Sequence, residues 1–148
     1  MAKQLVWKLK FERGRAAVGV MAQLMLPLVS AMPDSVALVP APTATGRTRQ
    51  RGYDQALLLA RRLARHSCVA YLPCLQRHGQ SQQRGATRQE RLVQLAQAFL
   101  VTQPAAVQGK HVVLVDDVLT TGATIEAAAA ALKAAGARRV SAVVFAQA

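Results

Sequence analysis

The chain has 148 residues, which suits a single domain with one hydrophobic core. Hydrophobic residues make up 52% and aromatic residues only 4%, a balance that disfavours extended disorder and favours helices packed on a sheet over an aromatic-rich sandwich. Lysine and arginine number 19 against 7 aspartates and glutamates, so the formal net charge is +12. Such a charge attracts polyanions, namely pyrophosphate, nucleotides, nucleic acid or an anionic membrane.

The N-terminal region predicts a helix from about Gln4 to Leu26, because apolar residues recur there at helical spacing. Basic residues that precede an apolar run are also typical of an export signal, which stays the alternative. Glu12, Gln23 and Pro27 interrupt that pattern, and a bilayer span takes about 20 apolar residues. We therefore expect a helix that packs on the core, no membrane partner, and an apolar surface on which a second chain could form an oligomer.

Strand and helix patterns alternate along the rest of the chain. The predicted strands are Val36–Val39, Val69–Leu75, Ala98–Val101, His111–Val115 and Val140–Phe145. The predicted helices are Tyr53–His66 and Thr124–Ala135, with Gly136 as the C-terminal cap of the second and with Leu92–Phe99 helical or mixed. Polar loops are predicted at Thr43–Gly52 and His78–Gln89.

This alternation predicts an α/β fold, a single domain with a central, mostly parallel sheet flanked by helices. Residues 1–35 would form an N-terminal helix and connector, and residues 36–148 the core. In parallel sheets, ligands bind beyond the carboxyl ends of the strands. We therefore expect the loops that follow Val39, Leu75, Val115 and Phe145 to gather at one rim.

Residues 112–124 place two adjacent acids, a polar turn and a helix start directly after an apolar strand. The backbone N–H groups and hydroxyls of the turn suit a phosphate, and its glycine permits a positive φ; the turn is Thr120, Thr121, Gly122, Ala123 and Thr124. Asp116 and Asp117 suit vicinal hydroxyls, as an acidic residue does for ribose in dinucleotide folds. They also suit a hydrated Mg²⁺, bound directly or through water. The segment predicts a site for a ribose 5-phosphate, whereas the structural alternative is that these residues only cap a strand and a helix.

Two cysteines are too few to stabilise a domain of this length through disulfide bonds, so a reducing cytoplasm is the expected location. A zinc set could be formed by His66, Cys68, Cys74 and His78, but zinc sites usually begin with a tighter Cys-x2-4-Cys pair. We therefore expect two buried thiols on or beside a strand.

The run Asp116-Asp117-Val-Leu-Thr-Thr-Gly-Ala-Thr124 resembles the phosphoribosyl-diphosphate motif of type I phosphoribosyltransferases. Further segments resemble the competence-protein ComF/GntX-like branch, among them Arg51-Gly-Tyr-Asp-Gln-Ala56 and Arg88-x-Glu90-Arg91. Asp54 and Gln94 stand where asparagine is usual in that branch. Its common N-terminal four-cysteine zinc module is not seen here, and either lies upstream of Met1 or is absent from this version.

The resemblance implies that the ribosyl group of 5-phosphoribosyl 1-diphosphate passes to a nucleophile and that pyrophosphate is released. It implies that Asp116 and Asp117 bind the 2- and 3-hydroxyls, that residues 120–124 bind the 5-phosphate, and that Mg²⁺ is the cofactor. The segment Pro40–Thr43, which includes Ala41 and Pro42, resembles the pyrophosphate loop. The acceptor stays unidentified.

Arginines complete the expected site. The polar loop His78–Arg91 is interpreted as a lid, from which Arg84 and Arg88 would reach the pyrophosphate; a solvated basic loop is the alternative. Arg51 is expected to face the same rim at the start of the second helix. Phe145 and Gln147 end the last strand and either meet a base or, for Phe145, pack in the core.

Two other functions are compatible with the sequence. One is a regulatory protein that binds phosphoribosyl diphosphate without catalysis. The other is a nucleic-acid-associated protein, since resemblance to the competence branch implies a role around DNA uptake. Ten arginines lie between Arg47 and Arg91 and would attract single-stranded DNA, although few aromatic residues accompany them to stack on bases.

Overall fold

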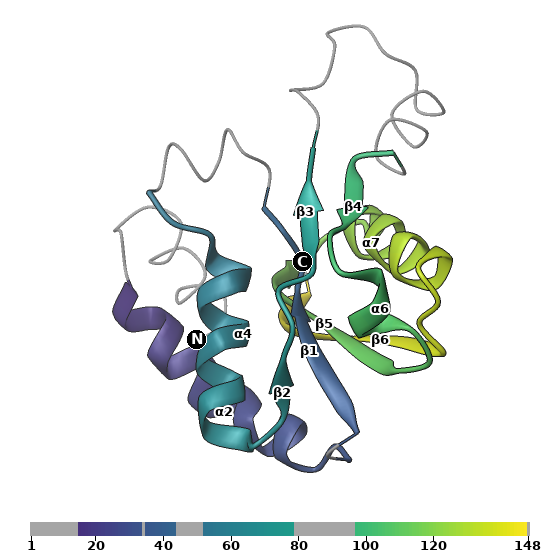
Figure 1. Cartoon of the computed structure of the whole chain (residues 1–148). Coiled ribbons are helices and arrows are strands. Elements are labelled where there is room, and N and C mark those ends of the chain that lie inside the picture. The colour runs from purple at the N-terminus through teal and green to yellow at the C-terminus, as the bar shows by residue number, and fades with distance from the viewer. Residues whose placement is uncertain (1–14, 34, 44–51, 79–96, 148) are drawn as a thin grey trace, which may run out of the picture.

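The computed structural model describes residues 15–33, 35–43, 52–78 and 97–147 (Figure 1). The start of the predicted N-terminal helix and most of Leu92–Phe99 lie outside these ranges. Along the chain the elements are α2 (Arg15–Ser30), β1 (Val36–Pro40), α4 (Gln55–Ser67), β2 (Ala70–Tyr71), β3 (Leu75–Arg77), β4 (Phe99–Val101), α6 (Pro104–Val107), β5 (His111–Leu119), α7 (Ala123–Ala134) and β6 (Arg139–Gln147).

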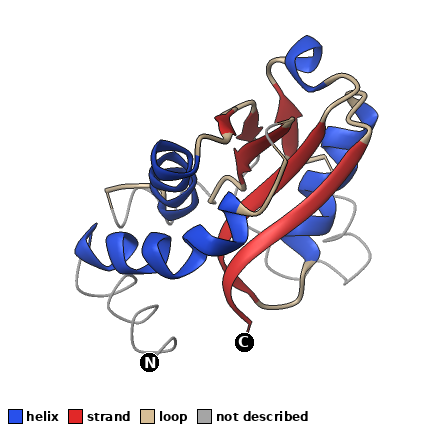
Figure 2. Cartoon of the chain, turned by 90° about the horizontal axis from the view of Figure 1, so that it is seen from below, coloured by secondary structure: helices blue, strands red, loops and turns tan. Residues whose placement is uncertain are grey.

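Four of the strands form a parallel sheet in the order β2-β1-β5-β6. β5 lies between β1 and β6, with Leu114 opposite Val39 on one side and Ala142 on the other. Strands β3 and β4 form a separate antiparallel pair. Figure 2 shows helices on both sides of the strands. The predicted class, an α/β fold with a mostly parallel sheet flanked by helices, is confirmed.

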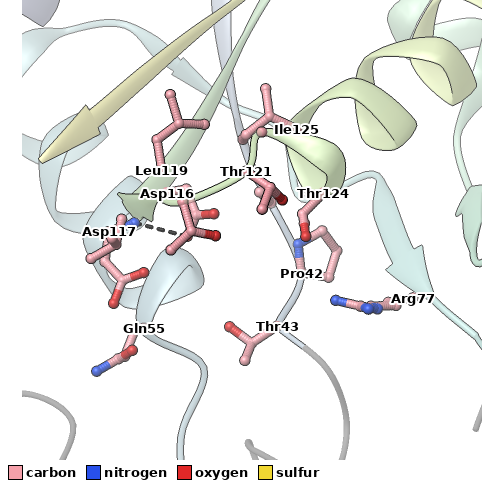
Figure 3. A pocket seen from close by; sticks show the side chains of 14 residues that line it. Pro42, Thr43, Gln55, Arg77, Asp116, Asp117, Leu119, Thr121, Thr124 and Ile125 are labelled. Atoms are coloured by element: carbon pink, nitrogen blue, oxygen red, sulfur yellow. Dashed lines mark hydrogen bonds between the residues drawn. The ribbon is translucent and has the colours of Figure 1, made fainter. Parts of the chain in front are cut away.

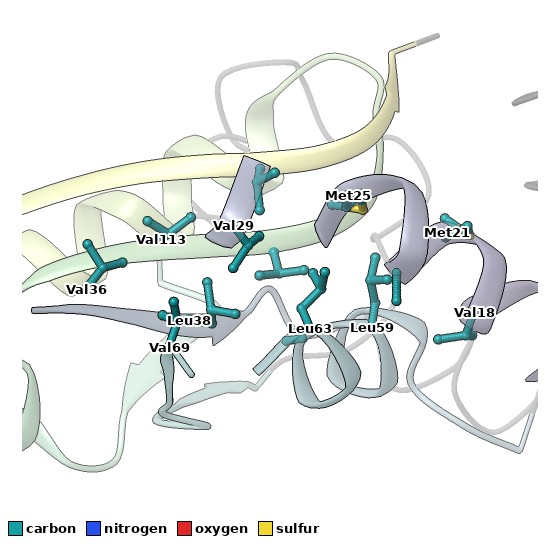
Figure 4. Packing of buried hydrophobic residues seen from close by; sticks show 14 of the residues in the cluster. Val18, Met21, Met25, Val29, Val36, Leu38, Leu59, Leu63, Val69 and Val113 are labelled. Atoms are coloured by element: carbon teal, nitrogen blue, oxygen red, sulfur yellow. The ribbon is translucent and has the colours of Figure 1, made fainter. Parts of the chain in front are cut away.

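The two faces of the sheet bury two different cores, because side chains alternate along each strand. Val113 and Val115 of β5 face α2 and α4, where Met25 and Leu63 are among the buried partners (Figure 4). Val112 and Leu114 face the other way, toward α6, α7 and the small β3–β4 sheet. β5 is therefore buried on both sides, as expected for the central strand of a parallel sheet.

The prediction of one strand over Val69–Leu75 is wrong. The segment splits into β2, which pairs with β1, and β3, which pairs with β4 in the other sheet. Between them Pro73 has no N–H to donate to a strand neighbour, and the N–H of Cys74 donates to the carbonyl of Leu72 at 2.9 Å. The turn at Pro73 therefore redirects the chain from one sheet to the other.

Several boundaries also differ from expectation. Helix α2 continues through Pro27 to Ser30, because the exposed proline removes only one donor and the buried side of the helix keeps packing through Met25 and Val29. β5 runs on to Leu119, and the short helix α6 was not predicted. Gly136 is confirmed as the C-terminal cap of α7, with a φ of 96° and its N–H donated to the carbonyl of Lys133 at 2.9 Å.

No helix in the described ranges is both long and apolar enough to cross a bilayer. The apolar surface expected on the N-terminal helix is present on α2, where Val20, Leu24 and Leu28 are exposed large hydrophobic residues. They form a row on α2 next to that of the buried Met21, Met25 and Val29, about 100° around the helix.

Candidate functional site

A cavity of about 110 Å³ opens at the carboxyl ends of β1 and β5. Figure 3 shows the side chains around it. It brings together the predicted acids, the polar turn and the loop after β1; its lining is Ala41, Pro42, Thr43, Gln55, Arg77, Asp116, Asp117, Val118, Leu119, Thr120, Thr121, Gly122, Thr124 and Ile125. Of the described residues predicted to bind the sugar phosphate and its pyrophosphate, only Pro40 and Ala123 do not line this cavity. The expected convergence at one rim is thus seen for described residues that follow Val39, Leu75 and Val115, but not for those that follow Phe145.

Asp116 and Asp117 lie within β5, whereas the sequence predicted a strand that ends at Val115. Because neighbouring strand residues point to opposite faces, Asp116 follows Val112 and Leu114 toward the α7 side, and Asp117 points toward the α4 side. Both still line the cavity, which lies across the end of the strand. The two carboxylates therefore approach one cavity from different faces of the sheet.

The surroundings of the two carboxylates can be described one at a time. Burial, and then the neighbouring charge of Asp117, raises the pKa of Asp116 from an ordinary 3.8 to about 7. Oδ1 of Asp116 accepts a hydrogen bond from the N–H of Asp117 at 2.8 Å. Oδ2 of Asp117 is buried and has no hydrogen-bond partner among the described residues. A buried acceptor without a donor favours a ligand that supplies one, such as a sugar hydroxyl.

The turn between β5 and α7 has the geometry expected of an anion cradle. Gly122 has a φ of 80°, which favours glycine, and α7 begins at the next residue. Thr120, Thr121 and Thr124 surround this helix start and line the cavity. The N–H of Ala123 has only a long contact, 3.4 Å, with the hydroxyl of Thr121. Backbone N–H groups at a helix start carry partial positive charge and suit a phosphate.

The loop after β1 forms the opposite wall. Its start is fixed by the N–H of Ala41, which donates to the carbonyl of Val115 at 3.0 Å. Its end is fixed by Asp54, which accepts hydrogen bonds from the N–H of Thr43 at 2.9 Å and from its hydroxyl at 3.3 Å. Asp54 also caps α4 by accepting the N–H of Leu57 at 3.1 Å. The segment that resembles a pyrophosphate loop is thus held at both ends.

Sequence reasoning missed three residues of this site: Asp54, Gln55 and Arg77. Asp54 was noted only as a departure from the family pattern, although an aspartate just before a helix is an N-cap signal. Gln55 is 3% exposed yet lines the cavity beside Asp117. Arg77 reaches the cavity from β3, and its guanidinium carbon lies 5.6 Å from the ring centre of Phe99 on β4. The available signal was that Arg77 lies two residues after the buried Leu75 and therefore on the same face of β3.

Other predicted residues lie elsewhere in the fold or outside the described residues. Arg51, Arg84 and Arg88 are not among the described residues, so their expected contacts stay predictions. Phe145 packs against the core formed with α2 and α4, in line with the structural alternative. Gln147 is exposed beside Leu119 and does not line the cavity.

The zinc alternative is contradicted. Within the described residues, which include His66, Cys68, Cys74 and His78, no three potential ligands gather. Cys74 is buried as expected, but the expectation of a buried Cys68 is wrong. Cys68 is exposed because it ends α4 in the left-handed conformation, with a φ of 58°, before the chain turns into β2.

The residues of the cavity fit Mg²⁺ in the manner usual for that ion. Mg²⁺ prefers oxygen ligands and is commonly held by one or two carboxylates together with waters and substrate phosphates. Asp116 and Asp117 supply two carboxylates, and one oxygen of Asp117 has no protein donor in the described part of the chain. A complete protein cage is not needed for such a site.

Comparison with known proteins agrees with this geometry. A family model, the phosphoribosyl transferase domain, matches residues 54–148. Over 95 residues the chain is 36% identical to competence protein ComFC of Bacillus subtilis (strain 168), covering 64% of this chain and 37% of that protein. Over 144 residues it is 33% identical to DNA utilization protein YhgH of Salmonella typhi, covering 92% of this chain and 63% of that protein. The chain thus spans less than two thirds of either relative.

A solved structure, that of TT1426 from Thermus thermophilus, is similar with a TM-score of 0.45 and 19% identity, over 92% of this chain and 84% of that chain. At this level the likeness supports no further argument. The family match covers more than half of the chain and includes the acid pair and the turn, so the resemblance seen in the sequence is confirmed. The chain belongs to the phosphoribosyltransferase family, in its ComF-like branch.

Proposed function

We propose that the chain binds 5-phosphoribosyl 1-diphosphate and transfers its ribosyl phosphate to an acceptor, with release of pyrophosphate. One observation carries the proposal: the acid pair and the threonine–glycine turn line the same cavity. A phosphate cradle alone would suit many anions, and two carboxylates alone would repel them. A sugar that bears both free hydroxyls and a phosphate suits both, because its hydroxyls can donate to the carboxylates and its phosphate can occupy the turn.

In this proposal the 5-phosphate accepts hydrogen bonds from the turn that starts α7, where Thr121 and Thr124 add hydroxyl donors. The 2- and 3-hydroxyls donate to Asp116 and Asp117. Oδ2 of Asp117 is the acceptor that most needs such a donor, because it is buried without one among the described residues.

The pyrophosphate would lie between the loop after β1 and Arg77. Thr43 is held there by Asp54, and Arg77 reaches the same cavity from the neighbouring sheet. A guanidinium binds phosphate oxygens in a planar, two-point manner. Mg²⁺, bound through Asp116 and Asp117, would neutralise charge on the substrate's oxygens.

The proposed reaction breaks the bond between C1 and the pyrophosphate oxygen and forms a bond from C1 to the acceptor. The bonding electrons leave with pyrophosphate, and the acceptor gives up its proton to solvent. Positive charge develops on the ring as in glycoside hydrolysis, so the two carboxylates beside the ribose would stabilise it while Arg77 stabilises the departing pyrophosphate. We propose a cytoplasmic location, where nucleotide precursors are made.

Titration calorimetry with phosphoribosyl diphosphate and Mg²⁺ tests binding. We expect saturable binding by the chain and a loss of roughly tenfold or more in affinity for Asp116→Asn/Asp117→Asn. Glu126→Gln is the matched control, since it neutralises an exposed acid in the first turn of α7 that does not line the cavity. Equal loss in both variants, or no binding at all, would refute the proposed site. Release of pyrophosphate with candidate acceptors then tests transfer.

A second candidate is a DNA-associated or regulatory protein that binds the same ligand without transfer. It is supported by the names of the two relatives, which refer to competence and DNA utilization, and by the net charge of +12. Tight binding of phosphoribosyl diphosphate without pyrophosphate release for any purine, pyrimidine or amine acceptor would favour it. Pyrophosphate release that depends on Asp116 and Asp117 would favour the enzyme.

A further inference from the structure

A second cavity, of about 380 Å³, forms a groove between α2 and α4. It shares no residue with the cavity lined by Asp116 and Asp117 (the acid cavity). Its lining is Val18, Leu58, Arg61, Arg62, Arg65 and His66. This volume lies within the range of roughly 300–1,000 Å³ typical of small-molecule sites. Nothing in the proposed transferase reaction uses these residues.

The basic residues gather because of their spacing on α4. Arg61, Arg62, Arg65 and His66 follow one another at intervals of one and three residues, which places them on one side of a helix. All four are exposed. Several cations on one face repel one another, and a bound anion relieves that repulsion.

No acid in the described part of the chain balances this face. The described acids are Asp54, Asp116, Asp117 and Glu126, which lie at the start of α4, on β5 and on α7. Among the described residues, the three groove arginines make no hydrogen bond or ion pair. Within the described part of the chain their charge is therefore not neutralised by an acid.

The groove also positions one arginine. A Cβ added at Gly19 of α2 would lie 3.3 Å from Cζ and Nη2 of Arg62. The guanidinium of Arg62 thus lies close to the backbone of α2, and a side chain at position 19 would displace it. Glycine is a poor helix former, so helix propensity does not explain its presence in α2. The close approach of Arg62 is a reason for a glycine at this position.

The floor of the groove is apolar. Val18 is 4% exposed and packs between the two helices, and Leu58 lies beside it on α4 (Figure 4 shows Val18 beside α4). An apolar floor with arginines at the rim suits a flat, weakly polar group that carries phosphate. Guanidinium groups bind phosphate in a two-point manner and stack on planar rings.

We propose that the groove between α2 and α4 is a second ligand site, which binds a nucleotide through its phosphates. The nucleotide is either free, as a nucleoside triphosphate, or part of a single strand. The site goes beyond the proposed transferase function and does not depend on it, because the two cavities share no residue. Asp116→Asn/Asp117→Asn should therefore leave it intact.

Fluorescence anisotropy without Mg²⁺ tests the proposal, with a labelled nucleoside triphosphate and a labelled oligothymidylate as probes. Arg62→Ala/Arg65→Ala should weaken binding of the preferred probe about tenfold or more. The matched control, Arg138→Ala/Arg139→Ala, removes two exposed arginines at the start of β6 and should change affinity by no more than about twofold. If both pairs weaken binding equally, the interaction is general charge attraction and the proposal fails.

A third variant keeps the charge. Gly19→Leu places a side chain where the guanidinium of Arg62 lies, so it should weaken binding while net charge and the ends of α2 stay unchanged. Thermal unfolding of each variant confirms that it is folded. If the triphosphate binds, the ligand of the groove is a free nucleotide. If only the oligonucleotide binds, the ligand is a nucleotide within a single strand. Binding of neither probe, or unchanged binding by Gly19→Leu, overturns the inference.

Discussion

Asp54 and Thr43 are joined by two hydrogen bonds, one from the Thr43 N–H at 2.9 Å and one from its hydroxyl at 3.3 Å. The same carboxylate accepts the N–H of Leu57 and so caps α4. One side chain therefore fixes both the wall of the acid cavity and the start of the helix that carries Gln55 into it.

Asp54→Ala removes the helix cap and the tie to Thr43 together. We expect the free energy of unfolding to fall by about 1–2 kcal/mol, the usual effect of losing an N-cap. Affinity for phosphoribosyl diphosphate should fall as well, because the loop after β1 loses its anchor. Chemical denaturation and calorimetry measure the two effects separately.

Asp54→Asn is the matched control for that prediction. Its amide keeps one acceptor oxygen, which can still cap α4, but loses the second acceptor used by Thr43. Stability should then stay close to that of the parent chain while affinity falls. If Asp54→Ala weakens stability but leaves affinity unchanged, the loop is not part of the binding site.

The raised pKa of Asp116 predicts how stability depends on pH. Between its ordinary pKa of 3.8 and the folded-state pKa of about 7, the folded chain holds a proton that the unfolded chain has released. The free energy of unfolding should therefore fall as pH rises across this window, and it is not regained above it. Asp116→Asn cannot lose a proton, so its stability relative to the parent should rise by about 1–3 kcal/mol from low to high pH.

Urea denaturation of both chains at several pH values measures this difference. The expected result is a gap between the two chains that widens from about pH 4 to about pH 7. A gap that stays constant across this range would show that Asp116 titrates normally. It would then be a poor candidate for the buried partner of a sugar hydroxyl.

Arg77→Ala tests the cation that the sequence did not indicate. Because the guanidinium reaches the acid cavity, its removal should weaken pyrophosphate binding about tenfold. Stability should fall by at least about 0.5–1 kcal/mol, the contribution of a cation–π contact such as that with Phe99. Arg77→Lys keeps the charge without the planar group and should recover part of the affinity. Calorimetry with pyrophosphate gives the result, and equal affinity in all three chains would remove Arg77 from the site.

Gly122→Ala tests the turn, and Gly109→Ala is its matched control. Both glycines have a positive φ, 80° and 71°, and in both places an added Cβ has ordinary contacts or open space. Each substitution should therefore lower stability by about 1–2 kcal/mol through backbone strain alone. Only Gly122→Ala should also weaken binding of phosphoribosyl diphosphate, since Gly109 lies before the opposite end of β5. Equal affinities of the two variants would contradict a role for the turn in binding.

The two thiols should differ in reactivity. Cys68 is exposed, whereas Cys74 is buried and burial raises its pKa. Under native conditions maleimide should modify Cys68 quickly and Cys74 only after denaturation, as mass spectrometry would show. Fast modification of both in the folded chain would contradict the packing of Cys74 in the core. Added zinc should not protect Cys68, because no three potential ligands gather in the described residues.

The acid pair and the turn could be predicted because they are contiguous in the sequence. An apolar run, two acids, a glycine and a helix start are local signals, and the structure keeps them in one cavity. Arg77 could not be predicted in the same way, since its place depends on the pairing of β3 with β4, which are separated by more than 20 residues. The split at Pro73 had a local signal, but the apolar run around it suggested one continuous strand.

The alternation of Asp116 and Asp117 along β5 has a mechanical consequence. Each acid extends one of two independently packed layers, the layer of α2 and α4 on one side and that of α7 on the other. A sugar held by both acids would therefore tie the layers together. Substitutions deep within either layer, at Leu63 or at Leu132, could then tune ligand affinity without touching the ligand, by altering the tilt of one acid relative to the other.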